Sequence, residues 1–107
     1  MKRANVWRVK FEPAMGGEVR KQRPAVIVSN DAANRHLNRV QVVPLTSSVD
    51  QLFPSEAYVS VRGRRHKAMA DQLCTVSKAR LKNRVGHLSK GDMQAVEQAI
   101  KVQLGLT

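Results

Sequence analysis

Apolar and polar residues alternate in residues 5–11, which is the pattern of a half-buried β-strand. The side chains predicted to face the core are Trp7, Val9 and Phe11. Residues 24–29 differ, because they form a nearly continuous apolar run after Pro24. Such a run predicts a strand buried on both faces, and a proline is tolerated there because it stands at the first position of the strand.

The middle of the chain predicts more strands joined by polar connections. Residues 39–46 form one, and Pro44 within it favours a sheet edge or a bulge. Further along, the predicted elements are a strand at 57–62, a basic hairpin tip "RGRRHK" around Gly63, a strand at 68–76, a short helix or turn at 77–83 and a strand at 84–89. Residues 30–38 read as a loop with about one turn of helix, and residues 12–22 as a long exposed loop around Gly16-Gly17.

The last segment is predicted to be an amphipathic helix. Ser89 and Asp92 have the spacing of an N-terminal cap, and Gly105 ends the periodic pattern. The apolar positions recur at helical spacing at Met93, Val96, Ile100 and Leu104. Short strands followed by one helix, without strand–helix alternation, predict a mainly β fold: an antiparallel sheet or small barrel packed by a C-terminal α-helix, in one domain of residues 1–107.

The charge of the chain points to an anionic partner. Its 19 Lys and Arg against 8 Asp and Glu give a formal net charge of +11, a balance that attracts RNA, DNA or acidic protein segments. No apolar run is long enough to span a bilayer, and the N-terminus does not resemble a signal peptide. A cytoplasmic location is therefore expected, and the single Cys74 is interpreted as a buried structural thiol in a reducing compartment.

Several classes of chemistry are disfavoured by the sequence. The three histidines, His36, His66 and His87, stand alone without a second ligand at metal-binding spacing, so no metal or other cofactor is expected. The chain also has no helix-turn-helix pairing and few aromatic residues for stacking on bases. Polar residues at strand ends remain as the candidate site.

Two strand ends carry these residues. Arg23 enters the second predicted strand, while Thr46 and Ser47 leave the third, so adjacent antiparallel strands would bring them together. A guanidinium and hydroxyls suit a phosphate, and RNA supplies its own nucleophile in the 2′-hydroxyl. The alternatives are an Arg23 paired with a carboxylate such as Glu18, and a Thr46 that is an ordinary strand-end hydroxyl.

The chain resembles the MazF/PemK-type toxins of bacterial toxin-antitoxin pairs over essentially its whole length. The stretches that carry the resemblance are "RANVW", "GGEVRKQRPAVIVSND", "VVPLTSS", "ADQLCTVSKARL" and "VGHLSKGDMQAVEQAIKVQLGL", in that order. Within "RANVW", Ala4 and Asn5 replace the pair that is usual in the family. The resemblance implies a small SH3-like antiparallel barrel with a C-terminal α-helix, and a homodimer. It also implies metal-independent cleavage of single-stranded RNA that leaves 2′,3′-cyclic phosphate and 5′-hydroxyl ends.

The resemblance also implies roles for individual residues. Arg23 and Thr46 match the catalytic pair, and an acidic antitoxin segment is expected to bind near the lid-like loop of residues 12–22. The implied RNA contacts are Glu18, Ser29, Asn30, Ser47 and Gln72. Ser29 and Asn30 stand at the other end of the strand from Arg23, so RNA contact with both ends requires an extended groove or a dimer.

Further roles stay open at this point. Arg62, Arg64 and Arg65 in the basic tip are either an RNA backbone clamp or a solvated hairpin, and nothing places His66 or His87 beside Arg23. Two other functions are weighed against the ribonuclease. One is a toxin of the same fold that is not an enzyme and binds DNA gyrase through an exposed apolar C-terminus; in this chain, helix packing and its cap account for most of "VQLGLT". The other is a catalytically silent RNA-binding barrel.

Overall fold

The computed structural model describes residues 1–11 and 22–106, so Glu18 and most of the loop expected at residues 12–22 lie outside the described residues. Its elements are β1 (Asn5–Lys10), β2 (Gln22–Ile27), α1 (Asp31–His36), β3 (Arg39–Thr46), β4 (Glu56–Val61), β5 (Arg64–Met69), the 3₁₀ turn η1 (Ala70–Gln72), β6 (Cys74–Ser77), the 3₁₀ turn η2 (Lys78–Arg80), β7 (Leu81–His87) and α2 (Lys90–Leu104). None of the helices in these residues is long and apolar enough to cross a membrane.

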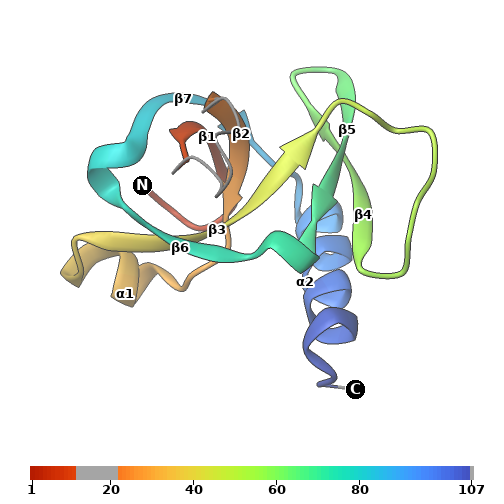
Figure 1. Ribbon diagram of the computed structural model, residues 1–107. Coiled ribbons are helices and arrows are strands. Elements are labelled where there is room, and N and C mark those ends of the chain that lie inside the picture. The colour runs from red at the N-terminus through yellow and green to blue at the C-terminus, as the bar shows by residue number, and fades with distance from the viewer. Residues whose placement is uncertain (12–21, 107) are drawn as a thin grey trace, which may run out of the picture.

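The strands form a curled antiparallel sheet with the order β4-β5-β3-β2-β1-β7, and β6 pairs with β3 beside this path. Figure 1 shows β1, β2 and β7 curling together on one side, while the β4–β5 hairpin stands on the other side with α2 against it. The chain is therefore mainly β with a C-terminal helix, as its pattern predicts.

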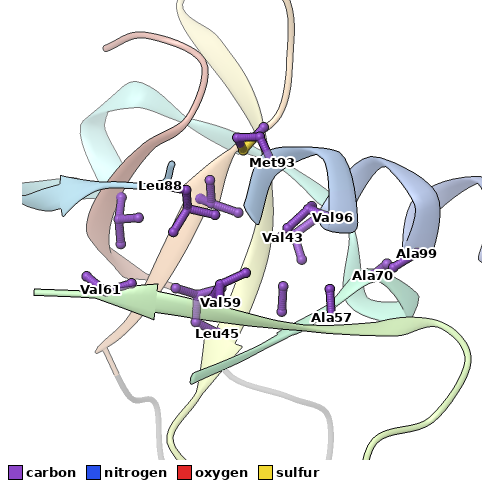
Figure 2. Packing of buried hydrophobic residues seen from close by; sticks show 13 residues of the cluster. Val43, Leu45, Ala57, Val59, Val61, Ala70, Leu88, Met93, Val96 and Ala99 are labelled. Carbon is purple, nitrogen blue, oxygen red and sulfur yellow. The ribbon is translucent and has the colours of Figure 1, made fainter. Parts of the chain in front are cut away.

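A first hydrophobic cluster lies between the sheet and α2. The cluster contains Met93 and Val96 of the helix together with Val43, Leu45 and Val59 of the strands (Figure 2). Ser89 caps α2 by accepting a hydrogen bond from the Asp92 N–H at 3.1 Å, and Gly105 ends the helix with a φ of 69°. Both caps agree with the sequence prediction.

The second cluster fills the curl of the sheet, and the two clusters together explain the apolar run in β2. Val26 belongs to the first cluster, whereas Ala25 and Ile27 belong to the second, so β2 is buried on both faces. In β1 the predicted core face is confirmed, because Trp7, Val9 and Phe11 all belong to the second cluster, with Val9 buried and the two aromatic residues partly buried. Val6 on the opposite face is also buried, in the first cluster.

Pro44 does not mark a sheet edge, because β3 is a central strand. Residues up to Val42 pair with β6, and pairing with β5 begins at Leu45. Pro44 lies between these two pairings, where a missing N–H leaves both ladders intact.

The basic tip and the strand after it also differ from the prediction. Arg62 and Gly63, both with positive φ, make a two-residue turn, and β5 begins at Arg64. Residues 68–76 are not one strand, because η1 separates β5 from β6. This interruption lets the chain move from one end of β3 to the other.

Candidate active site

The N-terminal end of β2 and the C-terminal end of β3 meet at one place. Ala25 pairs with Pro44, and continuing this antiparallel register by two residues sets Arg23 opposite Thr46. A pocket of about 290 Å³ opens there. Its lining residues are Arg8, Arg23, Pro24, Leu45, Thr46, Ser47 and His66. Arg23, Thr46 and Ser47, which were predicted from the sequence as site residues, thus line one pocket.

The pocket is strongly basic. Two guanidiniums, those of Arg8 and Arg23, line it together with the imidazole of His66. None of the lining residues among 1–11 and 22–106 is acidic. Within residues 1–11 and 22–106, neither arginine forms an ion pair. Cations that are not neutralised by carboxylates favour a phosphate, which accepts hydrogen bonds from the flat donor fork of an arginine.

Thr46 is half-buried at the end of β3, and its hydroxyl already has one partner. Its Oγ1 accepts a hydrogen bond from the backbone N–H of Ser48 at 3.2 Å. A hydroxyl has one proton to donate, and this contact does not use it. Thr46 therefore keeps a donor for an oxygen bound in the pocket.

The loop that leaves Thr46 is anchored by a buried ion pair that sequence reasoning missed. Lys67 Nζ lies 2.9 Å from Glu56 Oε1 and also donates to the Gln51 carbonyl, and the two charged side chains are only 9% and 11% exposed. Glu56 Oε1 accepts the Phe53 backbone N–H at 3.0 Å. Burial acts to raise the pKa of the Glu56 carboxyl, but the hydrogen bonds from Phe53 and Lys67 and the lysine charge outweigh it, so this pKa is lowered.

Ser29 and Asn30 stand between the C-terminal end of β2 and the start of α1, and neither is among the pocket-lining residues. Asn30 caps α1 by accepting the Ala33 N–H at 2.8 Å. Ser29 Oγ donates to the Asn34 side-chain oxygen and accepts the Gln41 N–H at 3.0 Å. Both side chains therefore have structural partners, and their contact with RNA stays a prediction.

Gln72 and the three arginines of the basic tip also lie outside the described pocket lining. Gln72 is exposed in η1, where its amide lies 3.6 Å from the Met69 sulfur. Arg62 is in the β4–β5 turn, and the Arg65 guanidinium lies 4.7 Å from the centre of the Tyr58 ring. Arg64 is exposed at the start of β5.

Two pocket residues were not found from the sequence. In the sequence, Arg8 has the position of a solvent-facing cation in an alternating strand. Its pairing with Pro24 places it at the N-terminal end of β2, beside the pocket. His66 was assigned to the hairpin tip, but β5 starts two residues earlier and carries this side chain back to the end of β3. In both cases the sequence pattern does not reveal how the strand pairs with its neighbour, and this pairing brings the side chain to the pocket.

Two other expectations concern Cys74 and metal binding. Cys74 is half-buried and packs against the second cluster, and burial raises the pKa of its thiol, as expected for a structural cysteine. Among the described residues, no three His, Cys, Asp or Glu side chains gather closely enough to hold a metal ion.

Comparison with known proteins agrees with the fold and covers nearly the whole chain. Residues 2–104 match the family of PemK-like, MazF-like toxins of type II toxin-antitoxin systems. The chain is 34% identical to the endoribonuclease MazF9 of Mycobacterium tuberculosis, over 99% of this chain and 98% of that protein.

Solved structures give the same result. An endoribonuclease from a mycobacterial species superposes with a TM-score of 0.82 at 25% identity, covering 98% of this chain and 91% of that one. A mycobacterial endoribonuclease in complex with its cognate antitoxin gives a TM-score of 0.81 at 26% identity, covering 100% and 97%. With the family match over residues 2–104, these likenesses establish that the chain belongs to the PemK-like, MazF-like toxins of type II toxin-antitoxin systems.

Proposed function

We propose that this toxin is an endoribonuclease that cuts single-stranded RNA without a metal ion, by attack of the RNA's own 2′-hydroxyl. The observation that carries this proposal is the pocket in which Arg23, Thr46 and Ser47 meet, with no carboxylate among the lining residues that the structure describes. The names of the similar mycobacterial proteins, which are endoribonucleases, support it independently.

In the proposed reaction the 2′-oxygen forms a bond to the adjacent phosphorus, and the bond from phosphorus to the 5′-oxygen breaks. The products are a 2′,3′-cyclic phosphate and a 5′-hydroxyl. Arg23 stabilises the negative charge that grows on the phosphate oxygens, because a guanidinium donates two parallel hydrogen bonds and remains charged. Thr46 donates its free hydroxyl proton to the same phosphate and holds it in line with the nucleophile.

The RNA is proposed to extend beyond this pocket. Ser47, which follows Thr46, is exposed and lines the pocket, so it is a candidate contact for the adjoining nucleotide. The RNA backbone is attracted by the guanidiniums of the β4–β5 hairpin, which are those of Arg62, Arg64 and Arg65. Gln72 and the residues after β2, Ser29 and Asn30, are candidate contacts farther along. Because Ser29 and Asn30 lie at the far end of β2, a strand of RNA reaches them only through an extended groove or on the other protomer of a homodimer.

An acidic antitoxin is the proposed protein partner. The formal net charge of +11 is complementary to an acidic segment, and a similar mycobacterial endoribonuclease has been solved with its cognate antitoxin. The toxin is proposed to act as a homodimer in the cytoplasm, where its RNA substrates and its antitoxin are made.

The experiment that tests this function is cleavage of a long single-stranded RNA in the presence of EDTA, followed by mapping of both new ends. We expect cleavage with 5′-hydroxyl and cyclic phosphate ends, and no cleavage at a site where the 2′-hydroxyl is replaced by hydrogen. Intact RNA, or cleavage that stops when metal is chelated, would refute the proposal. Binding of RNA without any cleavage would identify a catalytically silent RNA-binding barrel instead.

A second candidate function rests on the C-terminus. The last turn of α2 and the residues after it are not covered by helix packing, because Val102, Leu104 and Leu106 are 42%, 54% and 67% exposed. This corrects the expectation that packing and the cap account for this segment. An exposed apolar end is what a toxin that binds DNA gyrase would need. Toxicity that survives Arg23→Ala but is lost in Leu104→Ser would favour that function over the ribonuclease.

A further inference from the structure

The imidazole ring of His66, at the edge of the pocket, is held by a contact with the backbone. Its Nδ1 lies 3.2 Å from the backbone carbonyl oxygen of Arg64. A carbonyl only accepts hydrogen bonds, so Nδ1 must carry the proton that is donated in this contact. In the neutral imidazole the lone pair is then on Nε2, and Nε2 is a proton acceptor.

Among residues 1–11 and 22–106, the pocket lining otherwise lacks a group that accepts a proton near neutral pH. The guanidiniums of Arg8 and Arg23 offer only hydrogen-bond donors, and a threonine or serine hydroxyl is a weak base. Imidazole is the only side chain that, unperturbed, changes its charge between pH 5 and 8. Within the part of the chain that the structure describes, His66 is the one residue of this kind in the pocket lining.

We propose that His66 is a catalytic residue, the general base that takes the proton from the attacking 2′-hydroxyl; this proposal rests on the proposed ribonuclease function. The proton moves from the 2′-oxygen to Nε2 of His66 as that oxygen bonds to phosphorus. The 5′-oxygen leaves with the electrons of its bond to phosphorus and takes a proton from water. His66 then returns its proton to solvent, so the enzyme is unchanged after one cycle.

The neighbouring groups determine the orientation and the electrostatic environment of His66. From β1 and β2, the guanidiniums of Arg8 and Arg23 share the pocket with it, and β3 contributes the uncharged Thr46 and Ser47. On β4 its register partner is the apolar Val59, and on its own strand the Arg64 carbonyl holds Nδ1. The base is therefore oriented by the backbone and stands beside two cations that hold the phosphate.

The test is single-turnover cleavage of one RNA, at saturating toxin and in EDTA, over a range of pH. The wild-type rate is expected to rise with pH through the interval in which imidazoles lose their proton, and then to level off. His66→Asn keeps an amide N–H near the position of Nδ1 but has no base, so it should lower the rate roughly 100-fold or more and remove this rise. Binding of an RNA blocked by 2′-deoxy substitution should not change.

A matched control is His87→Asn, because His87 is exposed at the end of β7 and outside the pocket lining. This variant should keep both the rate and the pH profile. An unchanged rate in His66→Asn, or a lower rate with the wild-type pH profile, would overturn the role of His66 and leave the ribonuclease standing. A wild-type toxin that cuts no RNA would instead refute the proposed function itself, and with it the role of His66.

A second measurement does not depend on cleavage. Long-range nitrogen–proton correlation spectra of the imidazole rings, assigned with His66→Asn, report which ring nitrogen carries the proton. We expect the Nδ1-protonated form for His66 at a pH where the ring is neutral. The Nε2-protonated form would remove the acceptor from the pocket and overturn the proposal.

Discussion

Thr46, the last residue of β3, is the register partner of Lys67 in β5. The pairing joins the candidate active site to the buried ion pair, because Lys67 contacts Glu56 and the Gln51 carbonyl. The loop that begins after Thr46 therefore returns over the strand that supports Thr46. The same register sets His66, the residue before Lys67, at the end of β3 where the pocket opens.

The first prediction concerns the ion pair itself. Lys67→Met should lower the free energy of unfolding by about 3 kcal/mol, because it leaves the nearly buried Glu56 carboxylate without its cation. Urea denaturation followed by circular dichroism measures this change. The double variant Lys67→Met with Glu56→Gln should recover part of the loss, and a single variant as stable as the wild type would show that the pair does not support the loop.

The second prediction is a pH dependence of stability. The pKa of Glu56 in the folded protein lies below its ordinary value of 4.5, so the folded state favours the charged carboxyl. Its contribution is fully present above about pH 4.5 and is lost as the pH falls through the lower pKa of the folded state.

Unfolding of the wild type and of Glu56→Gln between pH 3 and 7 tests this sign. The difference in unfolding free energy between the two proteins should shrink as the pH falls below about 4.5. A difference that stays constant over this range would contradict it.

The third prediction separates binding from chemistry at Thr46. Thr46→Ala removes the hydroxyl proton that we assign to the phosphate, so the single-turnover rate should fall by roughly 100-fold while RNA affinity changes little. Thr46→Ser keeps the hydroxyl and should retain most of the rate. Equal losses of rate and affinity would make Thr46 a binding residue only.

The fourth prediction concerns the second guanidinium of the pocket. Arg8→Gln should weaken RNA binding and reduce the slope of log affinity against log salt by about 0.7, the effect of losing one phosphate contact to single-stranded RNA. Arg35→Gln is the matched control, since it removes the same charge from the exposed surface of α1. If both variants behave alike, Arg8 acts only through net charge and not through the pocket.

Helices and strands could be predicted from the sequence where the local pattern of apolar residues and caps is strong. Ser89 and Gly105 bound α2 as the sequence indicated, and the apolar run after Pro24 is a strand buried on both faces. The expectation that Pro44 marks a sheet edge was wrong, because its place between two strand pairings depends on the path of β5 and β6, which no local pattern contains.

The site was predictable only in part, for the same reason. Arg23 and Thr46 belong to strands that neighbour each other in sequence, so their meeting follows from a simple antiparallel pairing. His66 and Arg8 reach the pocket through the β4–β5 turn and the β1–β2 register, which are set by tertiary packing. Lys67 looks like one more surface cation in "RGRRHK", and only the position of Glu56 makes it a buried one.

Cleavage of RNA in this pocket is tested by comparing Arg23→Ala with the wild type. The quantity to measure is the single-turnover rate of each protein on the same RNA in EDTA. We expect a loss of at least about 100-fold in a variant whose circular dichroism and unfolding midpoint are those of the wild type. A folded Arg23→Ala that cuts the same RNA at the wild-type rate would contradict it.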